Sequence, residues 1–240
     1  MKVRLLLLAL AIGLVPLSLA LALAGVSVAA ATTVLPRPGF PLPASGNGSG
    51  TVKFTIVSSV AADPARDVVS PRPRGVRIDG PDGNTMHLVV GPGYTFDLKN
   101  FAWPPRIASG ERPYVYEQVV YANHAPDGKL YVETAHQTYA KSSFGQNGYL
   151  NAIDPKRSSL LWRSPAQVAN AYNFVLLNDT VVTGYGYTAE PDYLYAIDRG
   201  TGKVKGRVLL PSQAIRIARH GTTLTVDTYD HRVVVRVTGA

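Results

Sequence analysis

The sequence predicts an all-β fold built from short antiparallel strands. From residue 51 onward, short runs of β-branched and aromatic residues alternate with turn signals made of Gly, Pro, Asn and Asp. No stretch beyond residue 31 has the apolar spacing of an amphipathic helix. The chain also repeats itself, because Tyr149–Asp154 and Tyr193–Asp198 share Tyr-Leu-x-Ala-Ile-Asp at an offset of 44 residues (193 − 149).

The repeat divides the second half of the chain into three related units, at residues 127–167, 168–211 and 212–240. In the last two units, Thr180–Thr183 aligns with Thr223–Val226 at an offset of 43 (223 − 180). Repeats of this length are typical of propeller blades, each made of four antiparallel strands. Because 209 residues remain after the N-terminal segment (240 − 31), we predict a small or incomplete β-propeller of about four or five irregular blades.

The turn signals set the limits of the individual elements. "PDGN" at 81–84 predicts a hairpin between two strands. Segment 91–106 contains Gly-Pro-Gly and Pro-Pro, so we interpret it as irregular, and 164–174 as a short helix or a loop. The strands expected outside the repeated motif include 51–60, 75–80, 86–91, 113–122 and 129–136.

The N-terminal part differs from the rest. Residues 1–31 have a basic start, an apolar Leu/Ala stretch and small residues at their end, which indicates a secretory signal peptide; an uncleaved membrane anchor is the alternative. Residues 32–50 are rich in Pro and Gly and are expected to form a linker, leaving 51–240 as the folded domain. We therefore expect an exported protein, periplasmic or extracellular, whose membrane contact is confined to the N-terminal segment if that stays uncleaved.

Composition excludes several functions. The chain has no cysteine, so it has neither disulfides nor thiolate chemistry. The net charge is +8, but Lys and Arg are scattered without the interleaved aromatics of nucleic-acid binders, so we expect no nucleic-acid partner. One possible function of the positive charge is attachment to lipid or to an anionic polymer. It requires arginines clustered on one face, namely Arg66, Arg72, Arg74, Arg77 and Arg106. The five histidines lack metal-ligand spacing, so we expect no metal site.

The repeat resembles that of PQQ-like, or quinoprotein-type, β-propellers, whose pattern is Ala-x-Asp-x-x-Thr-Gly-x-x-x-Trp. One copy here has the start and end of the pattern, in Asp154 and Trp162, and the other has its start and middle, in Asp198 and Gly202. In the second copy Gly206 stands where the pattern has Trp. The aspartates are expected to cap turns and the glycine to take φ > 0. The resemblance implies that Trp162 fills the gap between adjacent blades.

The family's cofactor-binding features are missing from the sequence. The quinone-binding enzymes of the family use a pair of adjacent cysteines and a calcium site, whereas this chain has no cysteine and no carboxylate–asparagine set at ligand spacing. We therefore expect no cofactor.

The most unusual stretch is "TGYGYTAEPDY" at 183–193, which we interpret as a long loop between two strands. A loop with aromatic and acidic residues is a candidate binding site. The preceding unit has a long loop at 136–148, and long loops on successive blades would share one face. Alternatively, the tyrosines simply pack the loops against the blades. The candidate binding residues are Tyr185, Tyr187, Glu190, Asp192, His136 and Tyr139.

These observations lead us to expect a non-catalytic binding or scaffold protein of the cell envelope, whose propeller loops bind an envelope protein or a small ligand. The alternative is an enzyme acting on a small molecule or glycan at the same face, with Glu190 and Asp192, or Glu133, as acid and base. A deep pocket holding at least two of Glu190, Asp192, His136 and Tyr185 would favour the enzyme. A flat loop face with a filled centre would favour the binding protein.

Overall fold

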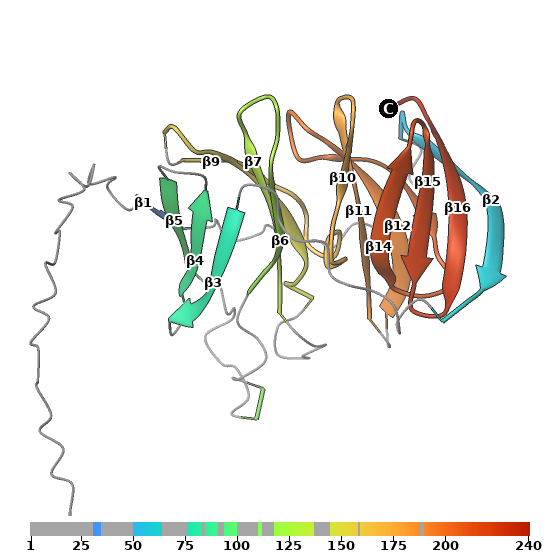
Figure 1. The fold of residues 1–240 in the computed structure, drawn as a ribbon, viewed down its shortest axis with the longest axis horizontal. Helices are drawn as coiled ribbons and strands as arrows, with labels where there is room; N and C mark the ends of the chain where they lie inside the picture. The colour runs from blue at the N-terminus through green and yellow to red at the C-terminus, as the bar shows by residue number, and fades with distance from the viewer. Residues whose placement is uncertain are drawn as a thin grey trace, which may run out of the picture.

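The computed structural model describes residues 31–34, 50–63, 76–82, 85–90, 94–99, 110–111, 118–136, 145–157, 159–187 and 190–240. These residues form four sheets of four strands each, which stand side by side (Figure 1). The secondary structure of the described residues is entirely β and turn, and none of them forms a helix that is long and apolar enough to cross a membrane.

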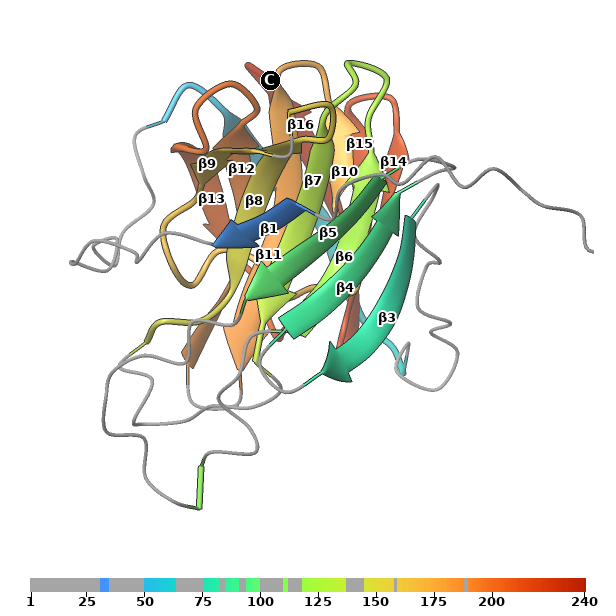
Figure 2. The ribbon, with the colours of Figure 1, turned by 90° about the vertical axis from the view of Figure 1, so that its left-hand side faces the viewer.

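The first sheet has the strand order β1-β5-β4-β3, and its strands face the viewer in Figure 2. Its strands are β1 (Ala31–Val34), β3 (Val76–Asp82), β4 (Thr85–Val90) and β5 (Tyr94–Lys99). The predicted hairpin is present, since β3 pairs antiparallel with β4. Strand β1 pairs parallel to β5, so this sheet departs from the predicted antiparallel blade. β1 also crosses the expected boundary between signal peptide and linker, so the linker's first residues belong to a sheet.

The second and third sheets are antiparallel meanders, each formed by consecutive strands. The second sheet contains β6 (Gln118–His124), β7 (Leu130–Ala135), β8 (Tyr149–Asp154) and β9 (Ser159–Arg163). The third sheet contains β10 (Val175–Leu177), β11 (Thr180–Tyr187), β12 (Glu190–Asp198) and β13 (Val204–Leu209). The predicted unit starting at residue 127 therefore misses its first strand, β6.

The fourth sheet combines both ends of the described chain. It contains β14 (Ala214–His220), β15 (Thr223–Thr228), β16 (His231–Thr238) and β2 (Lys53–Ala61). β2 pairs antiparallel with β16 and supplies the fourth strand that the last repeat unit lacks. The first and fourth sheets lie at opposite ends of the row, so the described sheets do not close into a ring (Figure 1). The predicted all-β, incomplete propeller is thereby confirmed.

One segment was interpreted wrongly from its sequence. Tyr94–Lys99 lies inside the stretch that we expected to be irregular, yet it forms β5 and pairs with β4 along its whole length. Its residues alternate between apolar and polar, as a strand with one buried face requires. The Gly-Pro-Gly before it and the Pro-Pro after it are strong turn signals, whereas the alternation between them covers only six residues.

The core consists of two layers, one on each face of the third sheet. Tyr195 and Ile197 pack towards the second sheet, whereas Leu194 and Ala196 pack towards the fourth. Because successive side chains of a strand point to opposite faces, a strand buried on both faces needs a continuous apolar run. This explains why Tyr193–Ile197 is apolar throughout instead of alternating.

The motif residues of the repeat lie at the contact between the second and third sheets. Asp154 accepts the backbone N–H groups of Lys156 and Arg157, and Asp198 accepts those of Gly200 and Thr201, so each aspartate closes its own turn.

Trp162 bridges the same two sheets. Its indole Nε1 donates to the carbonyl of Arg199 at 3.0 Å. Its ring lies against Gly202, where an added Cβ would come within 2.5 Å of the indole and where φ is +74°. A glycine is therefore needed at this turn for both its conformation and the space it leaves.

Candidate functional site

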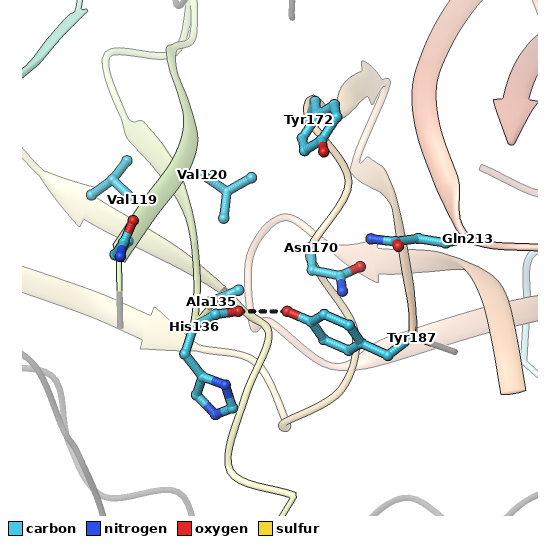
Figure 3. A pocket seen from close by; sticks show the side chains of 9 residues that line it. Val119, Val120, Ala135, His136, Asn170, Tyr172, Tyr187 and Gln213 are labelled. Carbon is cyan, nitrogen blue, oxygen red and sulfur yellow. Dashed lines mark hydrogen bonds between the residues drawn. The ribbon is translucent and has the colours of Figure 1, made fainter. Parts of the chain in front are cut away.

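A pocket of about 500 Å³ opens at the inner edge of the array, which is formed by the first strands of the second, third and fourth sheets, namely β6, β10 and β14. The pocket lies beside the start of β6, the ends of β7 and β11, and the connections that lead into β10 and β14. Figure 3 shows Val119 and Val120 on one side of the pocket and Gln213 on the other, with Asn170 and Tyr187 between them. The lining residues are Gln118, Val119, Val120, Ala135, His136, Asn170, Tyr172, Tyr187 and Gln213.

The strand register changes by one residue at three places around this pocket. β6 has an extra residue, Val120, between its pairs with β7. In the third sheet, Gly186 lies opposite two residues of β12, and in the fourth, Ile215 is the extra residue of β14. Such bulges turn side chains out of the regular alternation and are common near functional sites. Here the second, third and fourth sheets each contribute one.

The connection from β9 to β10 is fixed by two asparagines that bind backbone in the same way. Asn170 donates to the carbonyl of Gly186 and accepts its N–H, at 2.8 and 3.1 Å. Asn173 forms the same pair of bonds with Ile217, both at 2.8 Å. Tyr172 lies between them, and its N–H donates to the carbonyl of Ile215 at 3.1 Å. The connection is therefore attached to both the third and the fourth sheet. The segment is a loop rather than the short helix considered as one alternative.

Tyr172 is the exposed aromatic residue of the pocket, with 45% of its surface accessible. The N–H of Tyr172 is hydrogen-bonded, and the side chains of Asn170 and Asn173 fix the backbone before and after it. The position from which the ring projects is therefore set before any ligand binds. A preordered aromatic group loses little conformational freedom on binding.

The polar floor of the pocket joins the second sheet to the third. The Tyr187 hydroxyl donates to the carbonyl of His136 at 2.5 Å, the bond drawn in Figure 3. The N–H of His136 donates to the Asn147 side chain at 2.8 Å, so this residue is held on both sides of its backbone. Burial raises the pKa of Tyr187, which keeps its phenol protonated and able to donate.

The predicted loop at 183–193 is instead a pair of strands, and that prediction was wrong. β11 continues to Tyr187 and β12 starts at Glu190. Gly184 and Gly186 allow the strands to pack closely, because an added Cβ would lie 2.5 Å from Ala214 and 1.7 Å from Asp192, respectively. The Gly-Tyr-Gly-Tyr stretch is thus a strand with alternating small and large residues.

Two of the predicted binding residues, the buried Tyr185 and the half-buried Glu190, form a hydrogen-bonded pair. Tyr185 is 3% exposed and donates from its hydroxyl to Glu190 at 2.6 Å. Gln167 donates to the other carboxylate oxygen of Glu190 at 3.0 Å. Burial, together with the nearby Glu190 charge, raises the pKa of Tyr185. Tyr185 therefore packs in the core between the second and third sheets.

Asp192 lies on the other face of β12, towards the fourth sheet. Burial and the negative charges of Asp230 and Glu190 raise the pKa of Asp192 to about 6. Its carboxylate does not line the pocket, and neither does that of Glu190. The predicted acid pair is therefore separated by the strand that carries both residues.

Glu133 is a fully buried acid on β7. Thr183 of β11 donates a hydrogen bond to it across the interface of the second and third sheets. Burial raises the pKa of Glu133 to about 8, against the lowering effect of the Thr183 bond. Glu133 does not line the pocket either.

The remaining sequence candidates are distributed as follows. His136 and Tyr187 line the pocket, whereas Tyr139 lies outside the described residues, as do most of the arginines of the possible basic face. Within the described residues there is no group of three or more His, Asp or Glu side chains that could hold a metal ion.

Three residues that line the pocket were not predicted from the sequence, namely Tyr172, Gln118 and Gln213. The one available signal was "NAYN" at 170–173, in which two asparagines flank an aromatic residue in a connection between repeat units.

Comparison with known proteins identifies no family. No family model and no curated protein matches the chain. Among solved structures, the chain is similar to BamB from Moraxella catarrhalis, at 12% identity and a TM-score of 0.34, covering 68% of this chain and 58% of that one. It is also similar to the xyloglucan PUL protein GH43B of Bacteroides ovatus, at 12% identity and a TM-score of 0.34, covering 76% of this chain and 41% of that one.

The chain thus spans less than two thirds of either structure. Similarities of this size establish neither fold nor function. The fold is defined by the strand order of the chain itself.

Proposed function

We propose that this chain is an exported, non-catalytic binding module of the cell envelope that holds a small ligand or part of a partner protein in the inner-edge pocket. The observation that carries the proposal is the lining of the pocket. It combines an open cavity of a size typical of ligand sites with neutral amide and phenol groups, and none of the described lining residues carries a carboxylate.

The same lining argues against the enzyme alternative. Of Glu190, Asp192, His136 and Tyr185, the pocket is lined by His136 alone, whereas we required two of them. General acid–base catalysis needs a titrating group within hydrogen-bond reach of the reacting atom. The raised pKa values of Asp192 and Glu133 resemble those of catalytic acids. Both acids, however, lie in contacts between sheets and not in the pocket.

The binding proposal is tested with the mature chain, residues 32–240, and two tyrosine variants. Tyr172→Ala removes the exposed ring of the pocket, whereas Tyr229→Ala removes a tyrosine that is 66% exposed and lies outside the pocket lining. We expect crosslinking in an envelope extract to give partners or ligands that are lost with Tyr172→Ala and kept with Tyr229→Ala. Equal products from both variants would reject the pocket as the binding site.

The enzyme alternative is tested on the same protein with chromogenic glycosides and esters. We expect no turnover. Turnover that disappears with Asp192→Asn or Glu190→Gln would establish catalysis and overturn the proposed function.

Export is tested separately, with a C-terminally tagged full-length chain. We expect the tagged protein in the periplasmic or extracellular fraction, with a mass that corresponds to cleavage near residue 31. A full-length protein in the membrane fraction would instead support the uncleaved anchor.

A further inference from the structure

We infer that the inner-edge pocket binds a neutral, polyhydroxylated ring, a sugar unit, with the ring stacked on Tyr172. This inference deepens the proposed function and rests on it, because it names the class of ligand for the same pocket.

The polar side chains described in the pocket lining are mostly neutral. Its hydrogen-bonding side chains include the carboxamides of Gln118, Asn170 and Gln213 and the phenols of Tyr172 and Tyr187. Among the lining residues that the structure describes, there is neither a carboxylate nor a Lys or Arg cation. A charged ligand would lose hydration here and would find no Asp, Glu, Lys or Arg partner among these described residues, which is strongly unfavourable. The pocket therefore favours a neutral ligand.

The amide and phenol groups of the lining are also suited to the hydroxyl groups of a sugar. A carboxamide offers both donors and an acceptor, and a phenol both donates and accepts. Sugar hydroxyls likewise donate and accept at the same atom, so they match such groups in either direction. A purely apolar ligand would offer the Gln213 carboxamide no hydrogen bond, at a cost of about 1–3 kcal/mol if that group becomes buried.

The exposed ring of Tyr172 offers a flat surface on which a sugar ring can stack. Tyr172 is 45% exposed, and its main chain is tied to Ile215 between the Asn170 and Asn173 clamps. The face of an aromatic ring is partly negative, and the C–H groups on one face of a sugar ring are partly positive, so the two attract when stacked. Val119 and Val120 add apolar surface on one side of the pocket, and Gln213 lies on the other (Figure 3).

An extended peptide is the main competing occupant, since β6 is an edge strand of its sheet. Strand addition, however, requires a regular edge, and β6 is interrupted at Val120, where the extra residue breaks the pairing. The bulge at the pocket makes the edge less suited to a peptide and leaves the cavity beside it for a compact ring.

The test is saturation-transfer NMR and calorimetry with mature protein and the methyl glycosides of glucose, galactose, mannose and N-acetylglucosamine. Methyl glucuronide serves as the charged counterpart. We expect at least one neutral glycoside to bind and the glucuronide to bind at least tenfold more weakly. Tyr172→Phe keeps the stacking ring and should retain binding, whereas Tyr172→Ala should weaken it about tenfold or more. Gln213→Ala should weaken it as well, and Tyr229→Ala should leave it unchanged.

The outcomes separate this inference from the proposed function. Absence of binding by all four neutral glycosides, or binding that survives Tyr172→Ala, overturns the sugar inference. If a partner protein is nevertheless lost with Tyr172→Ala, the binding module stands with a peptide occupant. If glycosides bind and are also hydrolysed, the sugar inference stands and the non-catalytic function fails. Circular dichroism of each variant shows whether a loss reflects the pocket or the fold.

Discussion

The carbonyl oxygen of Val52 occupies the space that a side chain at position 206 would need, since a Cβ added to Gly206 would lie 2.1 Å from it. Gly206 pairs with Ala196 in the third sheet just as Trp162 pairs with Ala152 in the second. Trp162 therefore fills the contact between the second and third sheets, and the entry to β2 takes the equivalent place at the next contact. The N–H of Val52 also donates to the Lys205 carbonyl at 3.2 Å.

Restoring the repeat pattern at this position should therefore destabilise the protein. Gly206→Trp should push Val52 and the start of β2 away, with a loss of about 1–3 kcal/mol in unfolding free energy. The measurement is urea unfolding followed by circular dichroism, together with hydrogen exchange of β2, which should become faster. Gly110→Ala is the control, because a Cβ added there would meet nothing within 4 Å. Unchanged stability and exchange in Gly206→Trp would contradict this account of β2.

The second prediction concerns Trp162, which fills the contact between the second and third sheets. Trp162→Ala removes the ring that lies on Gly202 and the bond to the Arg199 carbonyl. Because Trp162 is partly buried, we expect a loss of about 2–3 kcal/mol, below the range for fully buried tryptophans. Trp162→Phe keeps most of the packing and should lose about 1 kcal/mol with the hydrogen bond. Equal losses in urea unfolding would show that the ring contributes nothing beyond its donor.

The fold could be predicted from the sequence wherever neighbouring residues determine the local structure. The repeated Tyr-Leu-x-Ala-Ile-Asp gave β8 and β12, and Asp and Gly gave the turns that follow them, because turn chemistry depends on neighbouring residues. The partner of β16 was not accessible, since the strand at 51–60 carries no mark of pairing with a strand almost 180 residues away. The only sequence sign of this pairing is Gly206, which leaves space for the backbone at Val52. That role of Gly206 is visible only once the contact with Val52 is known.

The pocket was inaccessible for a similar reason. The acids and tyrosines of 183–193 are reactive or hydrogen-bonding residue types close together in the sequence, so they were the predicted site. In the structure Tyr185 and Glu190 satisfy each other, and Asp192 faces another sheet. Tyr172 and Gln213 are unremarkable in sequence, and they become a site because bulges and asparagine clamps in three sheets bring them together.

The third prediction tests one of those clamps. Asn173→Ala leaves the N–H and carbonyl of Ile217 without their partner in a buried place. We expect unfolding free energy to fall by about 2 kcal/mol. Asn123→Ala, a half-buried asparagine on β6, should change it by less than about 0.5 kcal/mol. Comparable losses in both variants would mean that the connection is not held by the clamp.

The last prediction is a pH dependence that originates at Glu133. Burial raises the pKa of its carboxyl to about 8 in the folded protein, whereas the unfolded chain has the ordinary value near 4.5. Between these two values the folded state holds a proton that the unfolded state has lost. Unfolding free energy therefore falls as pH rises from about 4.5 to about 8, and levels off above it.

Glu133→Gln removes this titration while keeping an acceptor for Thr183. We expect the variant to gain stability relative to the parent as pH rises from 5 to 8, by a few kcal/mol at most. Asp192, whose pKa is raised to about 6, adds a slope of the same sign in both proteins and cancels in the comparison. Asp179→Asn is the control: Lys205 lowers the pKa of Asp179, so this residue titrates below the window and the variant should show a constant offset. Urea unfolding at six pH values measures all three proteins, and parallel curves for Glu133→Gln and the parent would mean that Glu133 is ionised in the fold.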